Sequence, residues 1–291
     1  MKLSVIIISF QSNHLLKKIL SNFEKKHQII IIENSMIQST KELEKKFKNA
    51  SVIIPSENLG YAKAFNLALK NCKNNFVLTI TPDVLINKNL INKIEKIINK
   101  FNKFTLLAPE YKNQKIYKNF TPFEKIKLLK KKINGFKIEN VKEIDWCFCI
   151  INRKKFKNSK ILDENFFMYF ETMDLCKKLE KLKHKMLVIR GLKFEHLGTS
   201  SSSKKFNNEI LLNRNWHFSW SKFYFFKKNR NYIFALRKIV PNIYQNILGI
   251  VLSLIKIRLF DAKLHLASLK GALNGIFLQK SSYRPNLNKN D

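Results

Sequence analysis

Short apolar runs alternate with segments of helical periodicity over roughly the first third of the chain, and this alternation constrains the fold more than any other feature. The runs are predicted strands at residues 3–9, 28–32, 51–54 and 76–81. Strands joined by helices run parallel, because each helix returns the chain to the same end of the sheet. The sequence therefore predicts an α/β fold with a mostly parallel sheet flanked by helices.

Three helices are predicted between and after these strands. Ser39 and Glu42 have the spacing of a capping box before a charged helix. A second helix is expected over residues 61–73, entered through Gly60. After the fourth strand, apolar residues recur at intervals of three and four, which places them on one helical face toward the sheet. These residues are Leu90, Ile91, Ile94, Ile97, Ile98 and Phe101.

The middle of the chain is less regular. Residues 110–143 are rich in lysine and lack a clear period, which favours a variable connection or lid. Residues 144–151 form a predicted buried strand, in which Cys147 and Cys149 are buried free thiols. The chain has 4 cysteines, unevenly spaced, which excludes a disulfide framework and a four-thiolate zinc site. A reducing cytoplasm fits this usage best.

A helix is expected over residues 170–182, followed by a strand over residues 186–190. Glu171 and Asp174 lie near the start of that helix, three residues apart and therefore on neighbouring positions of one face. Beyond the strand, His196 precedes a serine-rich turn. Residues 170–196 therefore contain two acids and a histidine that are candidates for a functional site.

The composition changes near residue 205, after the serine-rich turn at residues 199–203, which is expected to be mobile. The sequence predicts an α/β domain over residues 1–204 and a helical, basic and aromatic region over residues 205–291. Residues 247–260 are mostly apolar and flanked by cations. No segment is expected to supply the roughly 20 apolar residues that span a bilayer. An interfacial helix and a helix packed on the rest of the protein both remain open.

Lys and Arg number 55 against 21 Asp and Glu, which gives a formal net charge of +34. Such an excess favours polyanions, anionic lipid or phosphorylated substrates as partners. The wealth of lysine, asparagine and isoleucine fits AT-rich coding equally well, so part of the charge has a mutational explanation. The apolar content of 45% is enough for a sizeable core and excludes disorder of the whole chain.

Asp83 follows the fourth predicted strand in the sequence Thr81-Pro82-Asp83. Open α/β sheets bind ligands at the carboxyl ends of their strands, and Pro82 fixes the turn there. A carboxylate at this place can hold Mg²⁺ together with phosphate oxygens. An aspartate that only forms the turn is the alternative.

Several further blocks occur in one order along residues 1–203, and together they resemble family 2 glycosyltransferases with the GT-A (nucleotide-diphospho-sugar transferase) fold. The rhamnosyltransferase-like branch is the most similar. Several blocks in register are more specific than any one motif. The blocks are Ser4–Phe10, Ile30–Ser35, Asn58–Asn66, Thr81–Asp83, Phe166–Cys176 and His196–Ser200.

The resemblance implies that a nucleotide-sugar donor lies across the carboxyl edge of the sheet. It implies that Ser9 and Phe10 line the nucleotide pocket and that Glu33 bonds the base or the ribose. It also implies that Asn58 and Gly60 open the loop against the donor.

The same resemblance implies the groups around the diphosphate. Lys63 and Asn66 face the diphosphate or the sugar, and Thr81 and Pro82 lie beside the donor. Asp83 matches the metal-binding aspartate of the family, and His196 a histidine near the diphosphate; both are expected at a Mg²⁺ or Mn²⁺ site. A histidine at a strand end that bonds backbone is the other interpretation of His196.

The implied reaction is a single displacement with inversion, in which one general base takes the proton from the acceptor hydroxyl. Family members carry Glu-Asp where this chain has Glu171-Thr172, and the missing aspartate is the one assigned as base. Threonine cannot accept that proton, so Glu171 or Asp174 has to replace it. Otherwise the chain is a non-catalytic pseudo-glycosyltransferase that serves as a partner subunit.

The predicted function is the transfer of a hexosyl or rhamnosyl group from a UDP-, dTDP- or GDP-sugar to a glycan or lipid-linked acceptor. This implies a role in polysaccharide biosynthesis for the cell envelope. The basic C-terminal region predicts a cytoplasmic protein held peripherally at the anionic inner face of the membrane. Nucleic acid is not an expected partner, because no reading module accompanies the charge. A nucleotidyltransferase would share the sheet and Asp83, but Glu171–Cys176 and His196 favour sugar transfer.

Overall fold

The computed structural model describes residues 1–113, 118–128, 132–197 and 206–285. Its contacts divide the chain into two compact units. The sheet unit comprises Met1–Leu59, Ala64–Leu162 and Leu175–Ser202, and the helical unit comprises Gly60–Lys63, Asp163–Asp174 and Ser203–Asp291. Two short segments from within the predicted domain of residues 1–204 thus group with the C-terminal helices. The predicted turn at residues 199–203 lies outside the described residues.

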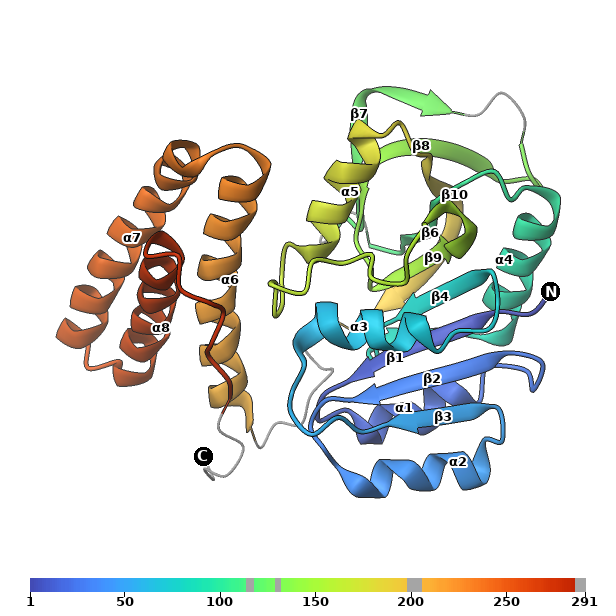
Figure 1. Cartoon of the computed structure of the whole chain (residues 1–291), viewed down its shortest axis with the longest axis horizontal. Coiled ribbons are helices and arrows are strands. Elements are labelled where there is room, and N and C mark those ends of the chain that lie inside the picture. The colour runs from blue at the N-terminus through green and yellow to red at the C-terminus, as the bar shows by residue number, and fades with distance from the viewer. Residues whose placement is uncertain (114–117, 129–131, 198–205, 286–291) are drawn as a thin grey trace. The chain divides into compact units, whose positions relative to one another are not determined.

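The described strands form a 10-stranded sheet in the order β3-β2-β1-β4-β9-β6-β10-β8-β7, with β5 paired to β10 (Figure 1). β3, β2, β1 and β4 run parallel, and the remainder of the sheet is mixed. The strands are β1 Ser4–Ser9, β2 Gln28–Glu33, β3 Ala50–Ile53, β4 Phe76–Ile80, β5 Val84–Leu85, β6 Leu106–Tyr111, β7 Phe120–Leu128, β8 Lys137–Ile144, β9 Phe148–Asn152 and β10 Met186–His196. The four strands expected first are therefore confirmed to within one residue at each end.

The predicted connection over residues 110–143 is wrong, because most of its described part is sheet. β7 and β8 pair antiparallel, and β8 pairs with β10. β7 is the edge strand, and lysines are common on such strands because their charge discourages pairing with other chains. Here the lysines obscured the alternation that marks a strand.

The predicted strand over residues 144–151 is interrupted. β8 ends at Ile144 and β9 begins at Phe148, and the Asp145 carboxylate accepts a hydrogen bond from the Cys147 backbone N–H at 3.0 Å. This side-chain turn breaks the pairing in the middle of an apolar run. All four cysteines are buried free thiols, which confirms the prediction made for Cys147 and Cys149.

Helices α2 to α5 follow the predicted ones, whereas α1 was not predicted; α3 and α5 each begin in a segment that groups with the helical unit. α4 is capped by Asn87, whose side chain accepts from the Leu90 N–H at 2.9 Å. Ser39 makes no capping bond; it lies inside a 3-10 turn, so the predicted capping box is wrong. The helices are α1 Asn13–Leu20, α2 Glu42–Lys46, α3 Gly60–Lys70, α4 Lys88–Lys100 and α5 Glu171–Lys181, with 3-10 turns at Gln38–Lys41 and Arg153–Lys155.

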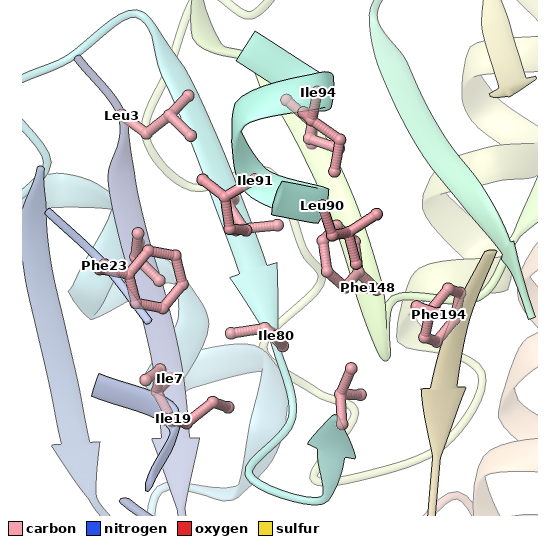
Figure 2. Close-up of a cluster of buried hydrophobic side chains, with 14 of the residues drawn as sticks. Leu3, Ile7, Ile19, Phe23, Ile80, Leu90, Ile91, Ile94, Phe148 and Phe194 are labelled. Carbon is pink, nitrogen blue, oxygen red and sulfur yellow. The ribbon is translucent and has the colours of Figure 1, made fainter. Parts of the chain in front are cut away.

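One apolar core lies between the sheet and the helices α1 and α4. Leu90, Ile91 and Ile94 of α4 pack with Ile80 and Phe148 of the strands (Figure 2). Strand residues that point to the opposite face, such as Ile6 and Ile30, are buried as well. A sheet buried on both faces accounts for strands that read as continuous apolar runs.

The helical unit contains α6 Asn207–Asn229, α7 Tyr232–Ile255 and α8 Leu259–Ile276, which all pack on one another (Figure 1). Its interior is partly polar: the Ser219 hydroxyl bonds that of Ser268 at 2.6 Å, and the Asn246 amide donates to Ser268 at 3.1 Å. Glycines let the backbones approach closely. A Cβ on Gly271 would meet the Trp216 carbonyl of α6.

α7 is the one helix among the described residues that is long and apolar enough to cross a membrane, with a mean hydropathy of 1.3 over its best window. The expectation that no segment would reach this length is therefore wrong. Pro241 stands inside the helix instead of ending it, so the apolar stretch begins well before residue 247. The test concerns length and composition alone.

Candidate functional site

The carboxyl ends of β1 and β2 bring Ser9 and Glu33 together in register, and both are fully buried. The Glu33 carboxylate accepts from the Ser35 N–H at 3.0 Å and from the Ser35 hydroxyl. The Asn34 N–H donates to the Ser9 carbonyl at 2.8 Å. Glu33 thus orients the loop that follows β2. Phe10, which follows Ser9 in the sequence, is half-buried.

Asp83 and His196 form the best-defined pair at this edge of the sheet. The His196 Nε2 atom lies 3.0 Å from Asp83 Oδ1, and the Leu197 N–H donates to the Asp83 carbonyl at 2.9 Å. The antiparallel pairing of β5 with β10 places Val84 opposite His196 and so joins residues far apart in the sequence. Asp83 follows Thr81 and Pro82, of which Thr81 is half-buried and Pro82 buried.

The two side chains shift each other's pKa. Burial raises the pKa of Asp83, but the hydrogen bond and charge of His196 outweigh burial, so the pKa lies below its usual value. Burial lowers the pKa of His196, while Asp83 and, less strongly, Asp145 raise it above its usual value. The pair therefore favours a carboxylate beside an imidazolium.

Asp145 is a residue that the sequence did not single out. It lies in the turn between β8 and β9, and the Thr81 N–H donates to the Cys147 carbonyl of the same turn at 3.0 Å. An acid inside an apolar run was read as part of a strand. The only signal was the charge itself, which is rare in the middle of a buried strand.

Once His196 has lost its proton, the neutral imidazole nitrogen and the Asp83 carboxylate oxygen suit Mn²⁺ as two donors of a larger set, and the carboxylate also suits Mg²⁺. The residues that the structure describes contain no group of three or more His, Cys, Asp or Glu placed to hold a metal. Asp83 and His196 consequently fit a site that is completed by oxygens of a ligand and by water.

Gly60 begins α3 with φ of +70°, a conformation that favours glycine. A Cβ here would collide with the Phe167 carbonyl and ring, and the Tyr61 N–H donates to that carbonyl at 2.6 Å. Gly60 thus allows residues 166–170 to lie against the start of α3. Asn58 precedes it and is half-buried.

Of the two remaining predicted residues on α3, Lys63 is exposed and Asn66 is buried. The Asn66 amide donates to the Leu162 carbonyl at 2.9 Å, and its oxygen accepts from the Ile161 and Leu162 N–H groups at 3.1 Å. These bonds fix the loop at residues 161–162. The predicted role of Asn66 toward a donor stays a prediction.

The two acids of α5 differ in their surroundings. Asp174 Oδ2 accepts from Lys228 Nζ at 2.6 Å, and Asp174 Oδ1 accepts from the Asn229 amide at 2.8 Å. Lys228 also reaches Asp163 at 2.7 Å, so one lysine of α6 joins both acids. Both oxygens of Asp174 are therefore committed to α6. Glu171, which opens α5, is also buried.

The chain enters α5 through strained backbone. Tyr169 and Phe170 have φ of 68° and 67°, which is costly for aromatic residues. Their rings pack against Phe218 and Phe225 of α6, which holds this conformation in place. Strained backbone of this kind is found most often at functional sites. Here the strained residues directly precede Glu171, the first residue of α5.

Comparison with solved structures identifies the fold as GT-A, as predicted. The mannosyltransferase PcManGT from Pyrobaculum calidifontis, solved in complex with GDP-Man and Mn²⁺, matches with a TM-score of 0.55 and 10% identity, over 96% of this chain and 88% of that chain. TarS 1-349 from S. aureus, in complex with UDP, matches with a TM-score of 0.52 and 18% identity, over 98% and 94% of the chains.

The sequence itself gives the family: residues 4–159 match the profile of glycosyl transferase family 2, and the chain belongs to that family. A curated relative is the low-salt glycan biosynthesis hexosyltransferase Agl10 of Haloferax volcanii, 26% identical over 190 residues. The alignment covers 60% of this chain and 60% of that protein. The predicted family is confirmed, whereas the rhamnosyltransferase-like branch stays a prediction.

Proposed function

We propose that this protein transfers a hexose from a nucleotide-diphosphate sugar to a glycan or lipid-linked acceptor. The observation that carries the proposal is the Asp83–His196 pair, at 3.0 Å, on the carboxyl edge of the sheet in a family 2 chain. The name of Agl10 as a glycan hexosyltransferase supports it. The complexes of PcManGT with GDP-Man and of TarS with UDP support a nucleotide-linked donor. A rhamnosyl donor and a role in envelope polysaccharides belong to the same proposal.

Asp83 and His196 would hold a divalent ion, Mg²⁺ or Mn²⁺. Such an ion screens the charge that develops on the departing diphosphate, which then leaves without a proton donor from the protein. The Mn²⁺ in the PcManGT complex supports this choice of group. Ser9 and Glu33, buried at the carboxyl ends of β1 and β2, would lie on the nucleoside side of the donor because they are polar groups at that edge.

The general base that we propose is Glu171. The acceptor oxygen forms a bond to the anomeric carbon while the bond from that carbon to the diphosphate breaks, and the configuration inverts. The hydroxyl proton passes to a carboxylate on the opposite side of the sugar. Asp174 is poorly suited because a lysine and an amide occupy both of its oxygens.

A pseudo-glycosyltransferase is the second candidate, and Thr172 favours it, because threonine stands where the base of the family is expected. The variant Thr172→Asp separates the two proposals. An enzyme with a displaced base gains turnover on restoration of the aspartate. A partner subunit without an acceptor site stays inactive although it binds the donor.

A thermal-shift and calorimetric screen tests the donor site. UDP-, dTDP- and GDP-sugars are tested with and without Mg²⁺ or Mn²⁺, on the natural protein, on Asp83→Ala and on Glu180→Ala, an exposed acid of α5 that serves as control. At 100 times its Kd, a donor stabilises the native state by about 2.7 kcal/mol. We expect metal-dependent stabilisation by one nucleotide class, lost only in Asp83→Ala.

The outcomes divide the proposal cleanly. Equal stabilisation of Asp83→Ala with and without metal would contradict the metal site and leave the donor site intact. Absence of stabilisation by all three nucleotide classes would contradict the transferase itself.

A further inference from the structure

The outer face of α7 is apolar along most of the helix. Large apolar side chains recur at helical spacing there, and their exposed fractions range from 45% at Leu248 to 72% at Ile255. Only 11% of the most apolar window is buried. The exposed large apolar residues from position 240 onward are Val240, Tyr244, Ile247, Leu248, Val251, Leu252, Leu254 and Ile255, called here the α7 face.

The inner face of α7 is polar in the second half of the helix, after the apolar residues Ala235 and Ile239 of the first half. Asn246 and Ser253 are buried, and the Asn246 oxygen bonds the His265 ring of α8 at 3.0 Å. Helices of water-soluble proteins place apolar residues inward and polar residues outward. This half of α7 has the reverse arrangement, so its outer face suits an apolar medium better than water.

Positive charge borders the α7 face at both ends. Residues 239–255 contain no charged side chain, whereas Arg237 and Lys238 precede them and Lys256 and Arg258 follow. All four cations are exposed. A cavity of ≈ 350 Å³ opens at the second end, lined by Lys256, Arg258 and His265 as well as Asp261 and Asn215. Apolar residues between cations form the pattern that binds anionic lipid.

We propose that the α7 face docks on an anionic lipid bilayer. α7 lies along the interface with its apolar side chains among the upper acyl chains, and the cations of its two ends meet lipid phosphates. The inference is independent of the proposed function, because it uses no residue of the donor site.

Docking along the surface fits the helical unit better than a span. α7 packs along α6, which carries Arg214, Lys222 and Lys227. Crossing would bring such cations toward the hydrocarbon core, where each is costly. A second copy is a poorer occupant, because two chains of +34 would repel and bring the flanking cations of both faces close together.

Vesicle flotation tests the proposal. The full chain is mixed with vesicles of phosphatidylcholine alone or of phosphatidylcholine with phosphatidylglycerol. The variant Val251→Asp/Ile255→Asp breaks the apolar face, and Leu182→Asp changes an apolar side chain that is 59% exposed in the sheet unit. We expect binding to anionic vesicles that falls roughly tenfold or more in the double variant and is unchanged in the control.

A charge pair sharpens the test. Lys256→Glu/Arg258→Glu should lose affinity for anionic vesicles by roughly tenfold, whereas Lys154→Glu/Lys155→Glu, which makes the same charge change on exposed residues of the sheet unit, should lose much less. Circular dichroism and thermal melting verify that each variant folds.

Three results would overturn the proposal. The first is equal flotation of the natural protein and Val251→Asp/Ile255→Asp. The second is flotation to the same extent with and without phosphatidylglycerol in the vesicles. The third is a dimer in sedimentation that this variant dissociates, together with no flotation, which would assign the α7 face to a second copy.

Discussion

The sheet unit has one large apolar core, whereas the helical unit buries polar side chains beside smaller apolar clusters. Ile7, Ile31 and Leu78 are typical of the sheet interior, and all are fully buried apolar residues. The helical unit buries His217 and Ser219 fully and leaves Ile255 exposed. Burial of apolar surface is the dominant stabilising contribution in folding, so the two units depend on different interactions.

The difference indicates how to interpret a buried polar group in each unit. In the sheet unit, Ser9, Glu33 and Asp83 stand at the carboxyl ends of strands, where the fold has no packing need for them, and they mark a binding edge. In the helical unit, buried polar residues bond one another and hold helices together. Asp174 belongs to the second kind, and we assign Glu171 to the first.

The largest expected effect separates these two acids. Glu171→Gln should lower kcat by about 10²–10⁴-fold, the usual contribution of a general base, because the amide cannot take a proton. Donor binding, measured by thermal shift, should stay within about twofold of the natural protein. Steady-state kinetics with the donor identified by the screen measure both. Full activity of Glu171→Gln would remove it as the base and leave Asp174 as the other candidate.

The sequence anticipated the sheet unit better than the helical unit, and the cause is physical. Strands buried on both faces are unbroken apolar runs, so β1, β2 and β4 were predicted almost to the residue. β7 and β8 were missed, because a half-exposed edge hairpin shows weak alternation among lysines.

The candidate site was predictable only where it is local. Asp83 was identified from its place after a strand, but its distance to His196 depends on the pairing of β5 with β10. The bond from Lys228 to Asp174 joins α6 to α5 and leaves no trace in local sequence. The sequence left Glu171 and Asp174 open as alternatives, and that tertiary contact favours Glu171.

The packing of the helical unit gives a second test of the comparison. In Gly271→Ala the new Cβ would overlap the Trp216 carbonyl, so α6 and α8 have to separate, at a cost of about 1–3 kcal/mol. In Gly275→Ala the nearest atom is the Phe223 Cβ at 3.1 Å, a milder contact. Alanine also favours helix over glycine by about 1 kcal/mol, so this variant should be close to neutral.

Urea denaturation of the two glycine variants, followed by circular dichroism, measures the difference. Equal loss in both would mean that the helices tolerate separation, and close backbone approach would then not be what holds the helical unit together.

The third prediction concerns the role of Asp174. Asp174→Asn removes one of the two acids that Lys228 joins, and we expect a loss of about 1–2 kcal/mol in the free energy of unfolding. The estimate is modest because the lysine side chain is 37% exposed and so partly screened by water. The double variant with Lys228→Met should not recover that loss, because Asp163 then also loses its lysine partner. If Asp174→Asn kept its stability and lost turnover instead, Asp174 would be the base.

The smallest effect concerns pH and His217. This ring is fully buried, stacks on Phe167 at 4.4 Å, and donates from Nε2 to the Tyr283 carbonyl at 2.9 Å. Burial lowers the pKa of His217 to about 3; the bond to Tyr283 opposes that shift, and nearby Arg284 adds to it. The ring is therefore neutral in the folded protein at every pH near neutrality.

The sign of the pH effect follows from proton binding. The unfolded chain binds a proton at His217 below about pH 6.5, whereas the folded chain does not until about pH 3. The protonation of His217 therefore does not lower the free energy of unfolding at neutral pH. As the pH drops from about 6.5 to about 3, that free energy falls by up to about 1.4 kcal/mol per pH unit. Denaturation midpoints of the natural protein, His217→Gln and the exposed control His14→Gln, measured between pH 7.5 and 5 (roughly the top of the window), isolate this contribution. Only His217→Gln should show a shallower dependence of stability on pH. Parallel curves for all three proteins would mean that the His217 ring is protonated, or open to water, in the folded state. The polar interior of the helical unit would then be less shielded from water than the comparison with the sheet unit requires.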